Sequence, residues 1–400
     1  MSINSVLFTK KELRSFCTYR LLFGIAYSIM IPLIPLFLKG LGLTTMLIGT
    51  VMSSYGISKT LIQIPFGVIS DKVGDKIILV LALLLMSIIP FSYTLTNSPT
   101  IASYIYIIQG AILGMAAPAT FSVLSRSVDD TRRGESTGLA SAVFTLGGGV
   151  GACIGGYFIS ALGNYNYAFY ISTFGIILTL IYVIFRIKSN SSSKSHKNNN
   201  NKHSLMDVFR EIKKYKLTYK ILVLGSIAFL GDYIYGCVVT LIHFYAKDVL
   251  NSTVAYSSAI ISIYLIVFGI GAPIAGWISD KIGNKKQLFL SFIVMNLTLL
   301  GLSFTKNIIL FTIIIIIYFL GATFLNASLQ STLSEFGNNN KIKGIVFGFV
   351  GASESFGYAL GPFISAYIYD INKSFLFSGL LCVSSLIFLI FILFNKKACI

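Results

Sequence analysis

The chain alternates between long apolar stretches and short polar connections along nearly its whole length. A helix needs about 20 apolar residues to cross a hydrocarbon core of about 30 Å. Alternating strands of about ten residues do not fit, because the runs are continuously apolar. The pattern therefore predicts an all-α integral membrane protein with twelve transmembrane helices, at residues 17–38, 46–68, 77–96, 100–122, 137–161, 166–185, 220–245, 254–276, 287–304, 308–330, 344–368 and 374–394.

One polar stretch is much longer than the others and lies near the middle of the chain. Residues 189–202 are almost wholly Ser, Asn, Lys and His, a composition that cannot bury a core and is typical of a flexible tether. We therefore expect an N-terminal six-helix half at residues 1–186, a linker at 187–218 and a C-terminal six-helix half at 219–400.

A charged, glycine-bounded segment occurs once in each half, at a shift of 209 residues. Further glycines of the fifth and eleventh spans match at a shift of 210. Matches at nearly one shift predict two homologous six-span units, as in duplicated transporters. The repeated segment consists of Gly67, Asp71, Lys72, Gly74 and Lys76 in the first copy and Gly276, Asp280, Lys281, Gly283 and Lys285 in the second.

Composition and charge agree with a membrane protein. Charged residues make up 11% of the chain, hydrophobic residues 55%, and the mean hydropathy is +0.81. The net charge of +17 does not require nucleic acid, because nearly all basic residues fall in segments on one side of the predicted spans. The positive-inside bias then places both termini and the linker in the cytoplasm, with the cell membrane as the location.

Several classes of function find no support in the sequence. The five cysteines show no metal-ligand spacing, and no nucleophile elbow or phosphate-binding loop is present. We therefore expect no enzyme, no metal and no cofactor. The expected partners are the lipid bilayer, a small-molecule substrate and protons, with the chain acting as a monomer.

With these features the chain resembles the major facilitator superfamily, whose loop pattern Gly-x-x-x-Asp-Arg/Lys-x-Gly-Arg-Lys is met in both copies except at Asp75 and Asn284. Within that family it is similar to the twelve-span drug/proton antiporter branch, because residues 151–156 approximate a Gly-Pro-x-x-Gly-Gly motif. Ala152 replaces the proline, and Tyr106 stands where that branch usually has an arginine. The resemblance implies a fold of two six-helix bundles and secondary transport.

The same resemblance implies a role for the repeated segment as a cytoplasmic gate. Asp71 would face the start of the eleventh span near Lys343 and Gly344, and Asp280 would face the start of the fifth span near Arg133. The alternative is that these charges only retain the loop in the cytoplasm. Glycines spaced by four residues predict close helix packing, or bending where the halves meet, at Gly147, Gly151, Gly155, Gly357 and Gly361, followed by Pro362.

Three ionisable residues lie near the middle of predicted spans, namely Lys59, Asp232 and Glu354. Each costs about 2.5 to 3.5 kcal/mol at a helix centre on insertion scales, so such a residue usually faces protein or a water-filled cavity. We expect Lys59 and Glu354 to come within pairing reach in at least one state, and Glu354 or Asp232 to exchange a proton. The alternative is a static charge pair that fixes packing.

Neutral polar residues of the spans are candidates for the lining of a substrate cavity, namely Tyr27, Gln63, Gln109, Tyr233, Tyr235 and Asn326. Together these features predict a secondary active transporter that exports a drug-like or cationic compound in exchange for protons. Uptake or exchange of a sugar, an organic anion or another metabolite is the second hypothesis, because Lys59 offers a positive charge to an anion. A membrane sensor that does not transport is a third.

Overall fold

The structure, a computed structural model, describes residues 11–127, 133–188, 218–334 and 340–398. Within these ranges the chain forms helices and no strand, and twelve of the helices have 20 residues or more. Their bounds are α2 Lys11–Met30, α4 Thr45–Val73, α5 Asp75–Thr94, α6 Pro99–Ser127, α7 Arg133–Leu162, α8 Tyr165–Arg186, α10 Thr218–Asp248, α11 Val254–Ile282, α12 Asn284–Phe304, α13 Ile308–Ser334, α14 Asn340–Ile371 and α15 Leu376–Ala398.

Ten of the described helices are long and apolar enough to cross a membrane. The two long helices outside that set are α4 and α14, which carry Lys59 and Glu354 and whose side chains are described only in part. The all-helical membrane fold agrees with the hydropathy pattern, and the count of twelve spans remains a prediction.

The first span differs from the uninterrupted helix expected at residues 17–38. Helix α2 ends at Met30, a short 3₁₀ turn η1 covers Ile31–Leu33, and α3 covers Ile34–Gly40. Pro32 and Pro35 stand in the first turns of these two short elements. Proline lacks the N–H that would continue an α-helix and clashes with the preceding turn, which accounts for the break.

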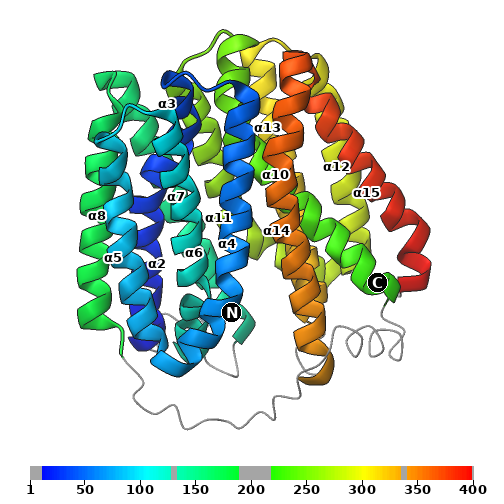
Figure 1. The fold of residues 1–400 in the computed structure, drawn as a ribbon. Coiled ribbons are helices and arrows are strands. Elements are labelled where there is room, and N and C mark those ends of the chain that lie inside the picture. The colour runs from blue at the N-terminus through cyan, green and yellow to red at the C-terminus, as the bar shows by residue number, and fades with distance from the viewer. Residues whose placement is uncertain (1–10, 128–132, 189–217, 335–339, 399–400) are drawn as a thin grey trace.

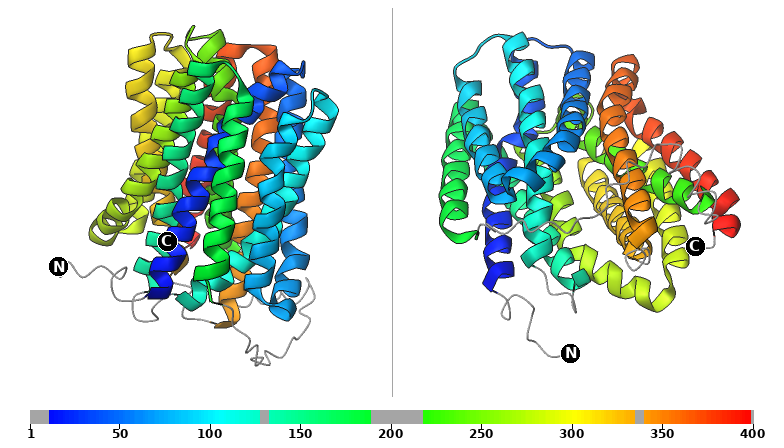
Figure 2. Two further views of the ribbon diagram at one scale, coloured as in Figure 1. Left: turned by 90° about the vertical axis from the view of Figure 1, so that its left-hand side faces the viewer. Right: turned by 60° about the horizontal axis from the view of Figure 1, so that its bottom comes forward.

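The helices form two bundles side by side, α2 to α8 and α10 to α15 (Figure 1). The bundles meet along two helix pairs, α4 with α14 and α7 with α11. The residues expected to link them, 187–218, lie almost entirely outside the described part of the chain. Helix α2 begins and α15 ends on the same face, which we call the terminal face; the face where α4 begins is the opposite face (Figures 1 and 2).

The predicted glycines allow equivalent close packing within each bundle. A Cβ atom at Gly151 of α7 would lie 2.2 Å from the carbonyl oxygen of Ile25 in α2. At Gly357 of α14 it would lie 2.2 Å from that of Phe229 in α10. Such contacts are possible only for a residue without a side chain, and they pack α7 on α2 and α14 on α10 in the same way.

The contacts between the bundles are closest toward the opposite face. A Cβ atom at Gly49 would meet the Pro362 carbonyl oxygen at 2.6 Å, whereas at Gly67, nearer the terminal face, it would meet only Pro118 of its own bundle, at 3.9 Å. At Gly276 it would meet nothing within 4 Å. Toward the terminal face, α4 and α14 accordingly separate (Figures 1 and 2).

Candidate functional site

The three ionisable residues singled out in the sequence lie at one depth. Lys59 lies 14 residues before the end of α4 at Val73, and Glu354 lies 14 residues after the start of α14 at Asn340. Asp232 likewise follows the start of α10 at Thr218 by 14 residues. At 1.5 Å per residue, each is about 21 Å from the helix end on the terminal face, and each remains partly exposed.

These groups also lie close enough to influence one another. Lys59 acts electrostatically on both Asp232 and Glu354, and Asp232 acts on Glu354. The ion pairs within the described ranges do not join Lys59 to either acid. The structure thus brings one cation from the first bundle near two acids of the second, without a closed salt bridge.

Asp232 borders a small cavity inside the second bundle. The cavity has a volume of about 70 Å³ and is lined by residues of α10, α11, α12 and α13, including Tyr264, Phe268 and Asn326. Asn326, a predicted cavity residue, therefore shares this space with Asp232. Small-molecule sites usually have volumes of about 300 to 1,000 Å³, so in this state the cavity is a local space beside Asp232 and not a complete binding pocket.

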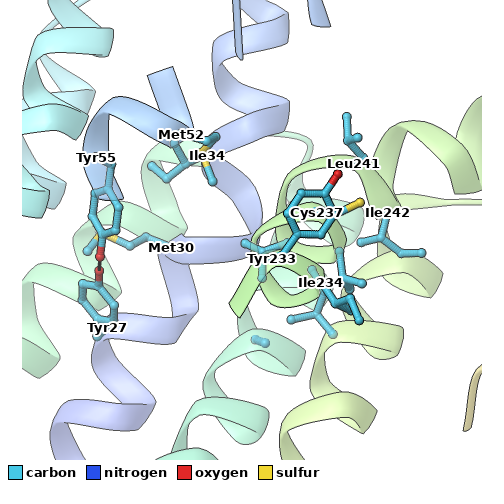
Figure 3. Packing of buried hydrophobic residues seen from close by; sticks show 14 of the residues in the cluster. Tyr27, Met30, Ile34, Met52, Tyr55, Tyr233, Ile234, Cys237, Leu241 and Ile242 are labelled. Atoms are coloured by element: carbon cyan, nitrogen blue, oxygen red, sulfur yellow. Dashed lines mark hydrogen bonds between the residues drawn. The ribbon is translucent and has the colours of Figure 1, made fainter. Parts of the chain in front are cut away.

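Tyrosines line the junction of the bundles one helical turn beyond the charges. Tyr27 and Tyr55 join their hydroxyl groups at 2.6 Å (Figure 3). The Tyr358 ring of α14 lies 5.9 Å from that of Tyr55 and 6.0 Å from that of Tyr235. Tyr235 in turn stacks on Tyr264 at 5.8 Å. We call these five residues the tyrosine wall.

The tyrosine wall repeats the duplication of the chain. Tyr27 and Tyr235 are 208 residues apart, and Tyr55 and Tyr264 are 209 residues apart. Each bundle therefore contributes one pair from equivalent helices, and Tyr358 bridges the pairs. Sequence reasoning selected Tyr27 and Tyr235 but missed Tyr55 and Tyr264, although the 209-residue shift of the loop motif already related these two.

Other predicted lining residues have different surroundings. Gln109 is fully buried; it accepts a hydrogen bond from Tyr93 at 2.9 Å and its amide nitrogen lies 3.4 Å from the Tyr27 hydroxyl. Tyr233 is buried where α10 meets α14. Gln63 is partly exposed. The hydrogen bonds of Gln109 fix the position of Tyr27, so this glutamine supports the tyrosine wall from behind.

The backbone conformation explains why two positions of the repeated segment, 74 and 283, are glycine. Gly74 has φ +104° and Gly283 has φ +87°, values that side-chain-bearing residues rarely adopt. Each ends one helix and begins the next. The proposed contacts of Asp71, Arg133, Lys343 and Gly344 concern side chains outside the described set, so the cytoplasmic gate stays a prediction.

Other residues of the segment are on the surface of the terminal face. Lys72, Asp280 and Lys285 are exposed, and the ammonium group of Lys281 lies 3.7 Å from the Trp277 ring centroid. Lys76 donates a hydrogen bond of 2.8 Å to the carbonyl oxygen of Ile184 at the end of α8. The lysines thus anchor the helix ends of this face.

Asp75, which departs from the family pattern, forms an ion pair with Arg126 at the end of α6. The carboxyl group is also the acceptor for the backbone N–H of Lys76. Its side chain is only 8% exposed, whereas that of Arg126 is 37% exposed. This pair ties the turn after α4 to α6, and the sequence offered no signal for it beyond the irregular residue itself.

Replacing Arg126 with Ala is expected to destabilise the protein by about 1 to 3 kcal/mol, because a nearly buried carboxylate loses its partner. Thermal unfolding of the purified protein in detergent measures this loss. Adding Asp75→Asn to Arg126→Ala should recover most of it, and Lys72→Ala, an exposed change nearby, should cause none. No recovery in the double variant would show that Asp75 is not the unpaired charge.

A fourth charge inside the bundles was not recognised from the sequence. Arg20 lies only three residues inside the first predicted span, residues 17–38, whereas α2 begins at Lys11 and carries Arg20 further into the bundle. Its guanidinium carbon lies 3.9 Å from the ring centroid of Phe144 in α7. The expected start of the span at residue 17 concealed this depth.

Comparisons with known proteins agree with the arrangement of helices. The model of a family described as the Major Facilitator Superfamily matches residues 16–346. The chain is 24% identical over 356 residues to the quinolone resistance protein NorA of Staphylococcus aureus, covering 86% of each chain. It is 24% identical over 358 residues to the multidrug resistance protein MdtG of Klebsiella pneumoniae, covering 86% of this chain and 84% of that one.

Other similarities concern a partial match and two solved structures. An uncharacterized MFS-type transporter of Methanocaldococcus jannaschii is 26% identical over 164 residues, which span 42% of that relative's length. The nucleoside transporter NupG has a TM-score of 0.75 at 14% identity, covering 96% of this chain and 98% of NupG. A bacterial homologue of the lysosomal transporter Spinster, in an inward-facing conformation, has a TM-score of 0.72 at 14% identity, covering 99% of each chain.

Proposed function

We propose that this chain, which belongs to the Major Facilitator Superfamily, exports a small drug-like or cationic compound across the cell membrane in exchange for protons. The observation that carries the proposal is the grouping of Lys59, Asp232 and Glu354 at one depth where the bundles meet. The names of NorA and MdtG, which refer to quinolone and multidrug resistance, support the substrate class.

The two acids are suited to proton exchange because neither is closed into a salt bridge within the described ranges. A carboxyl group near one lysine and a second acid changes its proton affinity when water enters or leaves its surroundings. Rocking of the two bundles would alter that hydration. The twelve-span topology, the cytoplasmic termini and the division at residues 187–218 belong to this same proposal.

The proposal is tested by reconstituting the purified protein in liposomes with an imposed pH gradient. Concentrative movement of a cationic compound that requires the gradient is the expected result. Counterflow that ignores the gradient would instead favour a facilitator. A sensor that does not transport would bind compounds without moving any of them.

The second candidate is uptake or exchange of an organic anion or another metabolite. Lys59 and Arg20 favour it, since both are cations of the first bundle without a carboxylate partner in the described ranges. The similarity of fold to a nucleoside transporter is compatible with it. Competition between anionic and cationic compounds in the same liposomes separates the two candidates.

With the terminal face on the cytoplasmic side, as proposed, bundles that join toward the opposite face would represent an inward-open state. One bond between the bundles there is specific: the Asp370 carboxylate at the end of α14 accepts the backbone N–H of Met46 at 3.1 Å. Met46 lies in the first turn of α4, whose N-cap is Thr44. A carboxylate at a helix N-terminus satisfies an otherwise free N–H and interacts favourably with the helix dipole.

Replacing Asp370 with Ala is therefore expected to weaken closure of the opposite face by about 1 kcal/mol, or roughly fivefold in population. Spin labels at exposed positions 95 and 309, in a cysteine-free background, report the separation of the bundles at that face. The long-distance population should increase in this variant and not in Lys306→Ala. An unchanged distance distribution would contradict the role of this bond.

A further inference from the structure

The turn between α11 and α12 on the terminal face carries basic side chains that the proposed transport does not use. Lys281 lies in the last turn of α11, and Lys285 and Lys286 lie in the first turn of α12. All three are exposed, and none has an ion-pair or hydrogen-bond partner among the residues that the structure describes. Together with the exposed Asp280 they give this turn a net charge of +2.

The only tryptophan of the chain lies directly beside these lysines. Trp277 is 53% exposed, one helical turn before Lys281, whose ammonium group lies 3.7 Å from the centroid of the ring. Ile270 and Ile274 are also exposed, and their spacing places them on the same side of α11 as Trp277. An exposed apolar row that ends in tryptophan and lysine is typical of the boundary between acyl chains and headgroups.

The first copy of the repeated segment provides an internal comparison for this turn. Its Asp75 and Lys76 both have partners inside the first bundle, through an ion pair with α6 and a hydrogen bond to the end of α8. The equivalent residues 209 positions later are Asn284, which carries no charge, and Lys285, which is exposed. The second copy therefore directs outward a charge that the first copy uses internally.

Two further positions differ between the copies in the same direction. Trp277 stands where the first copy has Val68, and Lys286 stands where it has Ile77. All four side chains are exposed, and a glycine with positive φ joins the two helices in both copies. Because the same turn forms without the tryptophan and the additional lysine, these residues are not needed for the fold of the turn. They indicate a partner outside the protein.

We propose that the turn between α11 and α12 is a binding site for the anionic headgroup of a phospholipid. The phosphate group lies among Lys281, Lys285 and Lys286, and the ring of Trp277 packs against the upper part of the acyl chains. Each lysine near a membrane surface favours anionic lipid about fivefold. Three lysines opposed by one aspartate are therefore expected to give a preference of about tenfold over a neutral lipid.

Fluorescence of Trp277 measures this preference directly, because no other tryptophan contributes to the signal. The purified full-length protein is reconstituted in bilayers of phosphatidylglycerol and phosphatidylcholine, with bromine on the acyl chains of one lipid at a time. Bromine quenches the emission of a tryptophan that it contacts. Brominated phosphatidylglycerol should quench wild type as if its local concentration were about tenfold above its share of the bilayer, and added salt should reduce the excess.

The combined variant Lys281→Gln, Lys285→Gln, Lys286→Gln should lower the preference to less than about twofold. Quenching by brominated phosphatidylcholine at the wild-type level verifies that the turn of this variant still lies in the bilayer. Lys72→Gln is the matched control, because Lys72 is the exposed equivalent of Lys281 in the first copy. This control should keep the tenfold preference.

Three results would overturn the proposal. They are equal quenching of wild type by the two lipids, a preference that survives in the combined variant, and an equal loss of preference in Lys72→Gln, which would indicate the charge of the whole face. Sodium phosphate should act no more strongly than sodium chloride at the same ionic strength. A specific loss of preference in phosphate would assign the lysines to a soluble anion instead of a lipid.

The proposal is independent of export and of proton coupling. The bilayers contain no transported compound and no pH gradient, so the quenching experiment reports the lipid site alone. Failure of gradient-driven transport in liposomes would leave the lipid preference unaffected, and equal quenching by both lipids would leave the transport proposal unaffected.

Discussion

Substituting Glu354 with Gln should reduce pH-gradient-driven transport to the level of liposomes without protein. Glutamine keeps the size and hydrogen-bonding capacity of the side chain but cannot bind and release a proton. The carboxyl group is partly exposed at the junction of the bundles and interacts with Lys59 and Asp232, so its removal abolishes the exchange that hydration changes would drive.

Exchange of labelled for unlabelled substrate without a gradient should persist in this variant, since that process needs no net proton movement. Glu12→Gln, which changes an exposed carboxylate near the start of α2, is the matched control and should transport normally. A gradient response retained by Glu354→Gln and lost by Asp232→Asn would transfer the coupling role to Asp232. Retention in both variants would leave these acids as a static packing pair.

Substituting Gly357 with Ala should destabilise the protein by about 1 to 3 kcal/mol, through overpacking of α14 against α10. The new Cβ atom would lie 2.2 Å from the Phe229 carbonyl oxygen. That atom belongs to the helix backbone and cannot rotate away as a side chain would. The two helices must therefore separate, which a lower temperature of thermal unfolding and a lower yield of monodisperse protein would report.

The same helix provides the control. A Cβ atom at Gly351 would meet nothing within 4 Å, so Gly351→Ala should be tolerated and gain up to about 1 kcal/mol of helix propensity. Equal losses of stability in the two variants would show that glycine flexibility, rather than close packing, is what α14 requires. Bending at the junction of the bundles would then regain support as the role of these glycines.

Much of the fold could be predicted because its strongest signals are local. Apolar runs long enough to cross a bilayer mark the helices, and the glycines at residues 74 and 283 mark turns that no other residue adopts easily. The interruption at Pro32 was missed because hydropathy does not register a missing backbone N–H. The first span was expected to begin at residue 17, whereas α2 begins at Lys11, so the depth of Arg20 in the bundle was underestimated.

The charged part of the site could be predicted and its aromatic part could not. Lys59, Asp232 and Glu354 stand out in apolar spans, because an ionisable group there has a cost that only protein or water relieves. Tyr55 and Tyr264 do not stand out, since tyrosine is common in this chain. The role of each ring depends on contacts with residues of other helices, which the sequence does not show. The Asp75–Arg126 pair joins α5 to α6 through residues that are far apart in the chain, so no periodic sequence pattern indicates it.

The bond between Asp370 and α4 places its sequence requirement on one partner only. Its donor is the backbone N–H of residue 46, which every amino acid except proline supplies. Substitutions can therefore accumulate at position 46 without loss of the bond, while position 370 must keep an acceptor of suitable reach. Such a contact produces no correlated change between two positions, and only coordinates can reveal it.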